Sequence, residues 1–307
     1  MANAFDTPKP PFGDRALAQG AIGAFDSGVG GLTVLRELHR QLPNESILYF
    51  GDTARVPYGD RSAAEIIHFV RDILDWMQGQ GVKAVVMACN TSSALALETV
   101  RQEYPFPILG IILPGARAAV HEGKRIGVIS TVATAKSHAY QRAIHEINPQ
   151  VQVWEVGCPA FVPLIEQNQI HSPKAEAIAR QYLQPLLDAQ IDTLIYGCTH
   201  YPHLAPVIQK ILPPSVHIVD PAVHVVAAAA QELDWLGLRS TTTRSSTRFC
   251  VSGSPDQFAL LSAQWIGYMP NVEQVIFPIT SNQPHPPWKW NPSMGLFEQG
   301  CSMEMDP

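Results

Sequence analysis

Short apolar runs alternate along this chain with longer stretches of helical spacing. The runs 21–25, 46–50 and 83–88 are built largely from aliphatic and aromatic residues, which predicts three buried strands. Leucines recur at helical spacing over 32–42, and a Ser-x-x-Glu capping box at 62–65 begins a second helical pattern. The resulting order of strand, turn and helix predicts an α/β fold.

The same order of elements begins again near residue 125. Apolar runs at 125–130, 151–156 and 191–196 predict the strands of a second unit. Cys89 follows the third predicted strand of the first half, and Cys198 follows the corresponding strand of the second half, 109 positions later. We therefore expect a duplicated chain that forms two similar doubly wound, flavodoxin-like domains, with the active site in the cleft between them.

The predicted division into domains follows from this duplication. The second domain is expected over 114–221. The helix and strand patterns that come after it are expected to return to the first domain, which would then comprise 20–113 and 222–278. Residues 1–19 and 279–307 contain prolines and glycines and show no helical or strand pattern, so we predict extensions without a fold of their own.

Composition narrows the class of protein. With 46% hydrophobic and 16% charged residues, the chain is predicted to be globular, and no apolar run approaches the roughly 20 residues that span a bilayer. The formal net charge of −6 argues against a nucleic-acid partner, because phosphate binding requires a basic face. The N-terminus lacks the apolar segment of a signal peptide. Neither nucleic acid nor membrane is therefore expected as a partner.

The cysteines point to a reducing compartment. None of the five has the CxxC or Cys/His spacing of a metal site, so no metal is predicted. An odd number without a pattern fits reduced thiols in the cytoplasm. The five positions are 89, 158, 198, 250 and 301.

One cysteine is expected at the edge of a sheet where ligands bind. The predicted strand at 193–196 is followed by Gly-Cys-Thr-His, which places Cys198, Thr199 and His200 at its carboxyl end. A helix is expected to begin near Pro202, and a helix N-terminus lowers a thiol pKa to roughly 3.5–7.5. The alternative is a buried structural cysteine.

Polar groups follow other predicted strands in the same way. Asp26 and Ser27 open a Gly-rich turn whose backbone N–H groups could hold an anion, although Asp26 could equally be a turn or cap residue. The turn lacks the spacing of a phosphate loop or a dinucleotide fingerprint. The loop 51–59 mixes aromatic and polar residues, as ligand loops do. Cys-Asn-Thr-Ser-Ser at 89–93 precedes a helix predicted over 94–101.

Three interpretations fit two cysteines that a duplication brings face to face. A disulfide is disfavoured in the cytoplasm. A single cysteine nucleophile paired with His200 would suit a hydrolase, but it leaves Cys89 unexplained. Proton removal on one face of a carbon and delivery on the other uses both thiols, and inversion of a stereocentre needs this arrangement.

Five motifs in the chain resemble those of glutamate racemases, in the same order and with the same spacing. The resemblance runs from about residue 20 to residue 277, and the five motifs together are highly specific. They lie at 26–34, 51–59, 88–94, 161–166 and 197–202.

The resemblance implies a cofactor-independent isomerase that interconverts L- and D-glutamate for peptidoglycan precursors. At the matching positions, Cys89 would exchange the Cα proton of D-glutamate and Cys198 that of L-glutamate. Asp26 would assist Cys89, while Glu166 and His200 would assist Cys198. The implied substrate contacts are Asp26, Ser27, Tyr58, Gly59, Asn90, Thr91, Thr199 and His200.

Two rival functions stay open at this point. An aspartate racemase would share the fold and hold a shorter side chain. A binding module would capture an amino acid without turning it over, although it would have no use for two cysteines. The oligomeric state is also open, with a homodimer among the options.

Overall fold

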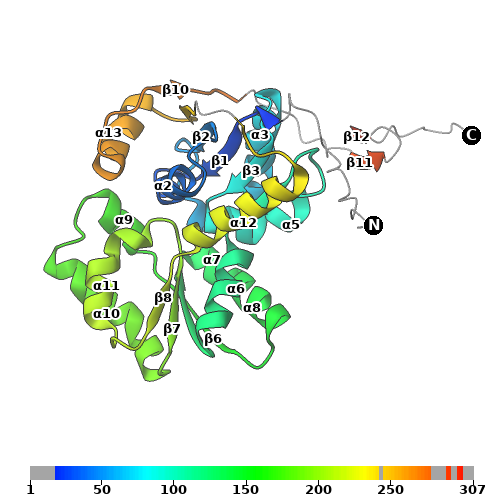
Figure 1. The fold of residues 1–307 in the computed structure, drawn as a ribbon. Helices are drawn as coiled ribbons and strands as arrows, with labels where there is room; N and C mark the ends of the chain where they lie inside the picture. Colours follow the sequence, from blue (N-terminus) through cyan, green and yellow to red (C-terminus); the bar gives the residue numbers. More distant parts are fainter. Residues whose placement is uncertain (1–17, 242–244, 278–287, 292–295, 300–307) are drawn as a thin grey trace, which may run out of the picture.

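Two parallel sheets organise the chain in the computed structural model, which describes residues 18–241, 245–277, 288–291 and 296–299 (Figure 1). The strands of the first sheet are β1 (Ile22–Asp26), β2 (Ile47–Gly51), β3 (Ala84–Met87), β4 (Ile108–Gly110), β9 (Thr247–Val251) and β10 (Val272–Gln274). Their spatial order is β10, β9, β2, β1, β3, β4, and all neighbours run parallel. β1, β2 and β3 are buried along their whole length, as expected of a parallel sheet covered on both faces.

The second sheet repeats this arrangement with four strands. They are β5 (Arg125–Ser130), β6 (Gln152–Gly157), β7 (Thr193–Gly197) and β8 (His217–Val219). Their order, β6, β5, β7, β8, is that of β2, β1, β3 and β4 in the first sheet, and all pairs are again parallel. The prediction of two similar α/β units is therefore confirmed, and β9 and β10 extend the first sheet beside β2.

The helices of the first unit begin and end at recognisable signals. α3 starts with a complete capping box between Ser62 and Glu65, and it buries one face that includes Ile66 and Val70. α12 starts at the Asp220 cap and ends at Gly237 in the left-handed conformation. The helices that connect strands of the first sheet are α2 (Leu32–Gln41), η1 (Tyr58–Asp60), α3 (Ala63–Gly79), α4 (Asn90–Leu95), α5 (Leu97–Val100) and α13 (Pro255–Ile266), and α12 (Pro221–Leu236) leads from β8 of the second sheet to β9 of the first.

The helices of the second unit follow the same strand-to-helix rule. They are α6 (Ile112–Glu122), α7 (Val132–Ser137), α8 (Ala139–Ile147), α9 (Phe161–Glu166), α10 (Pro173–Asp188), η2 (Tyr201–Leu204) and α11 (Ala205–Ile211). None of the helices in the described ranges is long and apolar enough to span a bilayer.

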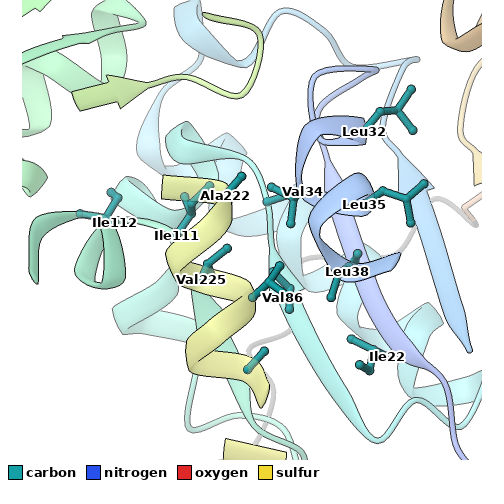
Figure 2. Packing of buried hydrophobic residues seen from close by; sticks show 14 of the residues in the cluster. Ile22, Leu32, Val34, Leu35, Leu38, Val86, Ile111, Ile112, Ala222 and Val225 are labelled. Carbon is teal, nitrogen blue, oxygen red and sulfur yellow. The ribbon is translucent and has the colours of Figure 1, made fainter. Parts of the chain in front are cut away.

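One hydrophobic cluster joins the two units. α12 packs against both α2 and α6, so side chains from the two halves of the chain share one core. Figure 2 shows part of this cluster, where Val86 of β3 lies between Leu38 of α2 and Val225 of α12. Because burial of this surface holds the units against each other, the carboxyl ends of both sheets are kept close.

The structure differs from the sequence-based elements in three helices. The helix predicted over 94–101 already begins at Asn90 and breaks into α4 and α5 at Ala96. The sequence also predicts a helix through Ser137 to Ile147, whereas the structure has α7 and α8 separated at His138, which adopts the left-handed conformation with φ 53°. The sequence predicts a loop over 158–166, whereas the structure has α9 there, because six residues are too few to distinguish helix from loop by periodicity.

The C-terminal extension also contains structure that the sequence did not predict. β11 (Trp288–Asn291) and β12 (Leu296–Gln299) pair as an antiparallel hairpin. Alternating aromatic and polar residues at 288–291 are typical of a strand, and this signal was missed among the prolines. Residues 1–17 of the predicted leader lie outside the described residues.

Candidate active site

A cavity of about 360 Å³ lies between the two units. Its walls come from the segments that follow the strands of both sheets, where ligands of open α/β sheets bind. The first unit contributes 27–28, 56–60 and 89–91, and the second contributes 131–132, 158–159, 162–163, 166–167 and 198–200.

Two free thiols enter this cavity from opposite units. Cys89 follows β3 and forms the N-cap of α4, while Cys198 follows β7. Both are buried, at 5% and 6% exposure, and neither is in a disulfide. The arrangement leaves both sulfurs available to one bound molecule.

The surroundings of Cys89 hold it in its protonated form. Burial and the negative charge of nearby Asp26 raise the pKa of the Cys89 thiol to about 12. Its sulfur lies 3.8 Å from the Ser27 hydroxyl. At neutral pH this thiol is a proton donor, and its thiolate, once formed, is a strong base.

Asp26 is fully buried and joins the two units. One carboxylate oxygen accepts a hydrogen bond from the Gly28 backbone N–H at 2.9 Å, and the other accepts from the Thr199 hydroxyl at 3.1 Å. Asp26 is not itself in the cavity wall, although Ser27 and Gly28 are. The carboxylate therefore acts on the cavity through its charge and through Thr199.

A chain of hydrogen bonds supports Cys198. Its sulfur lies 3.8 Å from Nδ1 of His200, whose Nε2 lies 3.2 Å from Glu166. Burial lowers the pKa of His200, but the interactions with Cys198 and Glu166 outweigh it and raise the pKa to about 10. His200 is therefore an imidazolium at neutral pH, and it can donate a hydrogen bond from each ring nitrogen. Trp265 of α13 contacts its ring edge-to-face, with centroids 5.7 Å apart.

The loop after β2 is held by a network behind the cavity. The Tyr58 hydroxyl donates to Asp52, a fully buried carboxylate that also accepts from Ser252 at 2.6 Å and Arg55 at 2.7 Å. The Tyr58 hydroxyl is thus directed to Asp52, while Tyr58 and Gly59 still line the cavity. Sequence reasoning identified this loop but missed the support from Asp52 and Arg55.

Asn90 and Thr91 are held by residues of the second unit. The Asn90 side-chain oxygen accepts from the Tyr140 hydroxyl at 2.7 Å. The Thr91 hydroxyl lies 2.9 Å from that of Thr131 and 3.2 Å from that of Thr134. Sequence reasoning missed these three partners. The duplication carried a signal for Thr131, because it stands 104 positions after Ser27, the same offset as between Asp26 and Ser130.

The Gly-rich turn after β1 allows the units to approach closely. A Cβ atom on Gly30 would lie 2.3 Å from Nδ1 of His200 and 2.4 Å from the Thr199 hydroxyl. On Gly31 it would lie 2.5 Å from the Cβ of Asp26. Candidate site residues are thus among the closest neighbours of these two glycines, and anion binding by the backbone N–H groups of the turn stays a prediction.

Metal-ligand groups are not gathered here. Across the described ranges, no three or more His, Cys, Asp or Glu side chains lie close enough together to hold a metal ion.

Several known proteins are similar to this chain in sequence and in fold. The model of the Asp/Glu/hydantoin racemase family matches residues 26–233. A glutamate racemase of Gloeothece citriformis is 64% identical over 265 residues, which cover 86% of this chain and 95% of the relative. The glutamate racemase isoform RacE1 of Bacillus anthracis has a structure with a TM-score of 0.82 and 38% identity, covering 85% of this chain and 99% of that chain. The glutamate racemase of Francisella tularensis in complex with D-glutamate has a TM-score of 0.80 and 36% identity, covering 84% and 98%.

Proposed function

Because the chain belongs to the Asp/Glu/hydantoin racemase family, we propose that it interconverts L- and D-glutamate by proton transfer between two thiols. The observation that carries this proposal is the presence of Cys89 and Cys198 in one cavity, each from a different unit. The 64% identity to a named glutamate racemase supports glutamate as the substrate.

The two thiols act on opposite faces of the substrate carbon. With L-glutamate, the Cys198 thiolate removes the Cα proton, and the bond electrons remain on the carbon and its carboxylate. The Cys89 thiol then delivers its own proton to the other face, which leaves D-glutamate and a Cys89 thiolate. With D-glutamate the same steps run in reverse, so no net proton is gained or lost.

The buried charges near Cys89 and Cys198 give the two thiols different roles in proton transfer. The raised pKa of Cys89 means that this side rests as the proton donor. Asp26 opposes loss of the Cys89 proton, and for the same reason it strengthens the Cys89 thiolate as a base. On the other side, protonated His200 donates one hydrogen bond toward Cys198 and another to Glu166, and the bond to Glu166 orients its ring.

The carbanion requires hydrogen-bond donors around the substrate carboxylate. Ser27, Asn90 and Thr91 line the cavity and carry hydroxyl or amide donors, while the hydroxyl of Thr199, which also lines it, donates to Asp26. Backbone N–H groups at the start of α4 add to them. Together they spread the negative charge that develops when the proton leaves.

The decisive experiment is racemisation by the purified protein without added cofactor. We expect turnover of L-glutamate and D-glutamate, with aspartate turned over far more slowly. In deuterated water, early product should carry deuterium while recovered substrate stays mostly protiated, because each thiol exchanges its proton with solvent. Binding without turnover would favour the amino-acid-binding module, and faster turnover of aspartate would favour the other racemase.

The setting of the reaction is part of the proposal. The mechanism requires both thiols reduced, which fits the cytoplasm, where D-glutamate would supply peptidoglycan precursors. Cys89 and Cys198 come from the same chain, so one copy contains both bases. Light scattering after size exclusion would distinguish a monomer from a homodimer.

A further inference from the structure

One amide donor in the cavity lacks a partner. Asn90 lines the cavity and is 2% exposed, yet its Nδ2 has no hydrogen-bond partner among the described residues. Buried polar groups are nearly always hydrogen-bonded, so a donor left unpaired beside a cavity indicates that a bound molecule completes it.

The other end of this amide is held by the second unit. The Tyr140 hydroxyl donates to Oδ1 of Asn90 at 2.7 Å. Tyr140 is fully buried, and burial followed by the charges of Asp220 and Cys198 raises its pKa well above the ordinary value. The phenol therefore keeps its proton. In the part of the chain that the structure describes, Asn90 Oδ1 is the acceptor for that proton.

The fold directs Tyr140 to this position. The left-handed conformation of His138 separates α7 from α8 and turns Tyr140, the second residue of α8, toward the first unit. His138 is held in turn by Glu155, with Nδ1 2.9 Å from the carboxylate. The backbone N–H of Ala139 donates to the Ser137 hydroxyl at 3.2 Å.

We propose that Tyr140 is a positioning residue that fixes the Asn90 amide, so that Nδ2 donates to a carboxylate oxygen of bound glutamate. The inference rests on the proposed function for the identity of the ligand. If the amide turned over, Oδ1 would face the carboxylate, and two acceptors would repel each other. The hydrogen bond from Tyr140 disfavours that orientation before the substrate arrives. Because it joins the two units, it forms only when they are packed as observed.

The test is Tyr140→Phe, which removes one oxygen and keeps the ring. We expect kcat/KM for both enantiomers to fall by up to about tenfold, the typical effect of one hydrogen bond, with a rise in KM accounting for most of the loss. Tyr104→Phe is the matched control. It removes a phenol oxygen that bonds Arg71 and Asp75 outside the cavity wall, so it should leave KM unchanged. An unchanged KM in Tyr140→Phe, or a loss confined to kcat, would overturn the proposal.

A double-mutant cycle separates positioning from general destabilisation. Asn90→Ala should raise KM, and adding Tyr140→Phe to it should change KM by less than about twofold, because the amide to be positioned is gone. If the two substitutions instead raised KM by factors that multiply in the double variant, Tyr140 would have a merely structural role and the proposal would be wrong. Wild-type turnover of glutamate, measured in the same series, tests the proposed function separately.

A second variant covers the case in which Tyr140→Phe does not fold. Asn90→Asp keeps an acceptor for Tyr140 and replaces the cavity-facing donor by an acceptor. We expect its KM to exceed that of Asn90→Ala. An Asn90→Asp variant with wild-type KM would contradict the donor role of Nδ2 and with it the proposal.

Discussion

Replacing Gly30 by alanine should disable the site although no side chain that takes part in the chemistry is replaced. The new Cβ would lie 2.3 Å from Nδ1 of His200, whereas ordinary contacts begin at 3.4 Å. His200 or the turn must therefore shift by about 1.1 Å. The nearby Thr199 hydroxyl, 2.4 Å from the same Cβ, must also move. Both residues belong to the hydrogen-bonded chains that support Cys198 and Asp26.

The size of the effect follows from this displacement. A misplacement of about 1 Å at a reacting centre costs on the order of 100-fold in rate, equivalent to about 2.7 kcal/mol of activation free energy. Overpacking should also lower the free energy of unfolding by about 1–3 kcal/mol. We therefore expect kcat/KM to fall on the order of 100-fold for both enantiomers, while the protein still folds.

The assay is racemisation of each enantiomer, monitored by circular dichroism. A thermal melt of each variant measures its stability. Gly79→Ala is the control, because a Cβ there meets nothing within 4 Å and the residue ends a surface helix. It should keep wild-type kcat/KM and melt at the same temperature or slightly higher. Wild-type kcat/KM in Gly30→Ala would show that the close approach of the turn to His200 is not needed, and the reasoning would be wrong.

Further outcomes follow from the charges and thiols of the site. Cys89→Ser and Cys198→Ser should each abolish measurable racemisation, since a hydroxyl is a far weaker acid than a thiol; near wild-type polarimetric rates in Cys198→Ser would rule out two bases. Asp26→Asn should lower the pKa of Cys89, measurable by thiol alkylation against pH, and reduce kcat more for D- than for L-glutamate; equal losses would make Asp26 a substrate-positioning group. Glu166→Gln should lower the pKa of His200 from about 10, as read by NMR titration of its ring, and an unmoved titration would refute the coupling. Because folding raises this pKa above 6.5, the stabilisation from His200 is complete below pH 6.5 and should fade as the pH rises through about 10, as urea titrations at several pH values would detect.

The amino-acid sequence by itself determined the local elements and their duplication. Hydrophobic periodicity and caps such as Ser62 with Glu65 depend on neighbours within a few residues, so they can be read without the fold. The same local logic placed Cys89 and Cys198 at the ends of equivalent strands. The two parallel sheets share one order of four strands, and in each sheet the carboxyl ends of the strands lie at the same edge. A cavity lined by these two edges follows from that geometry.

Only the tertiary structure decided which side chains meet across the two units. The hydrogen bond from Tyr140 to Asn90 joins residues 50 positions apart, and that from Thr199 to Asp26 spans 173. Such pairs depend on how α8 turns at His138 and how closely the Gly30 turn approaches, and neither is encoded in a periodic pattern. The protonation of Cys89 and His200 was likewise beyond the sequence, because pKa values follow from burial and from charges that only the folded chain brings together.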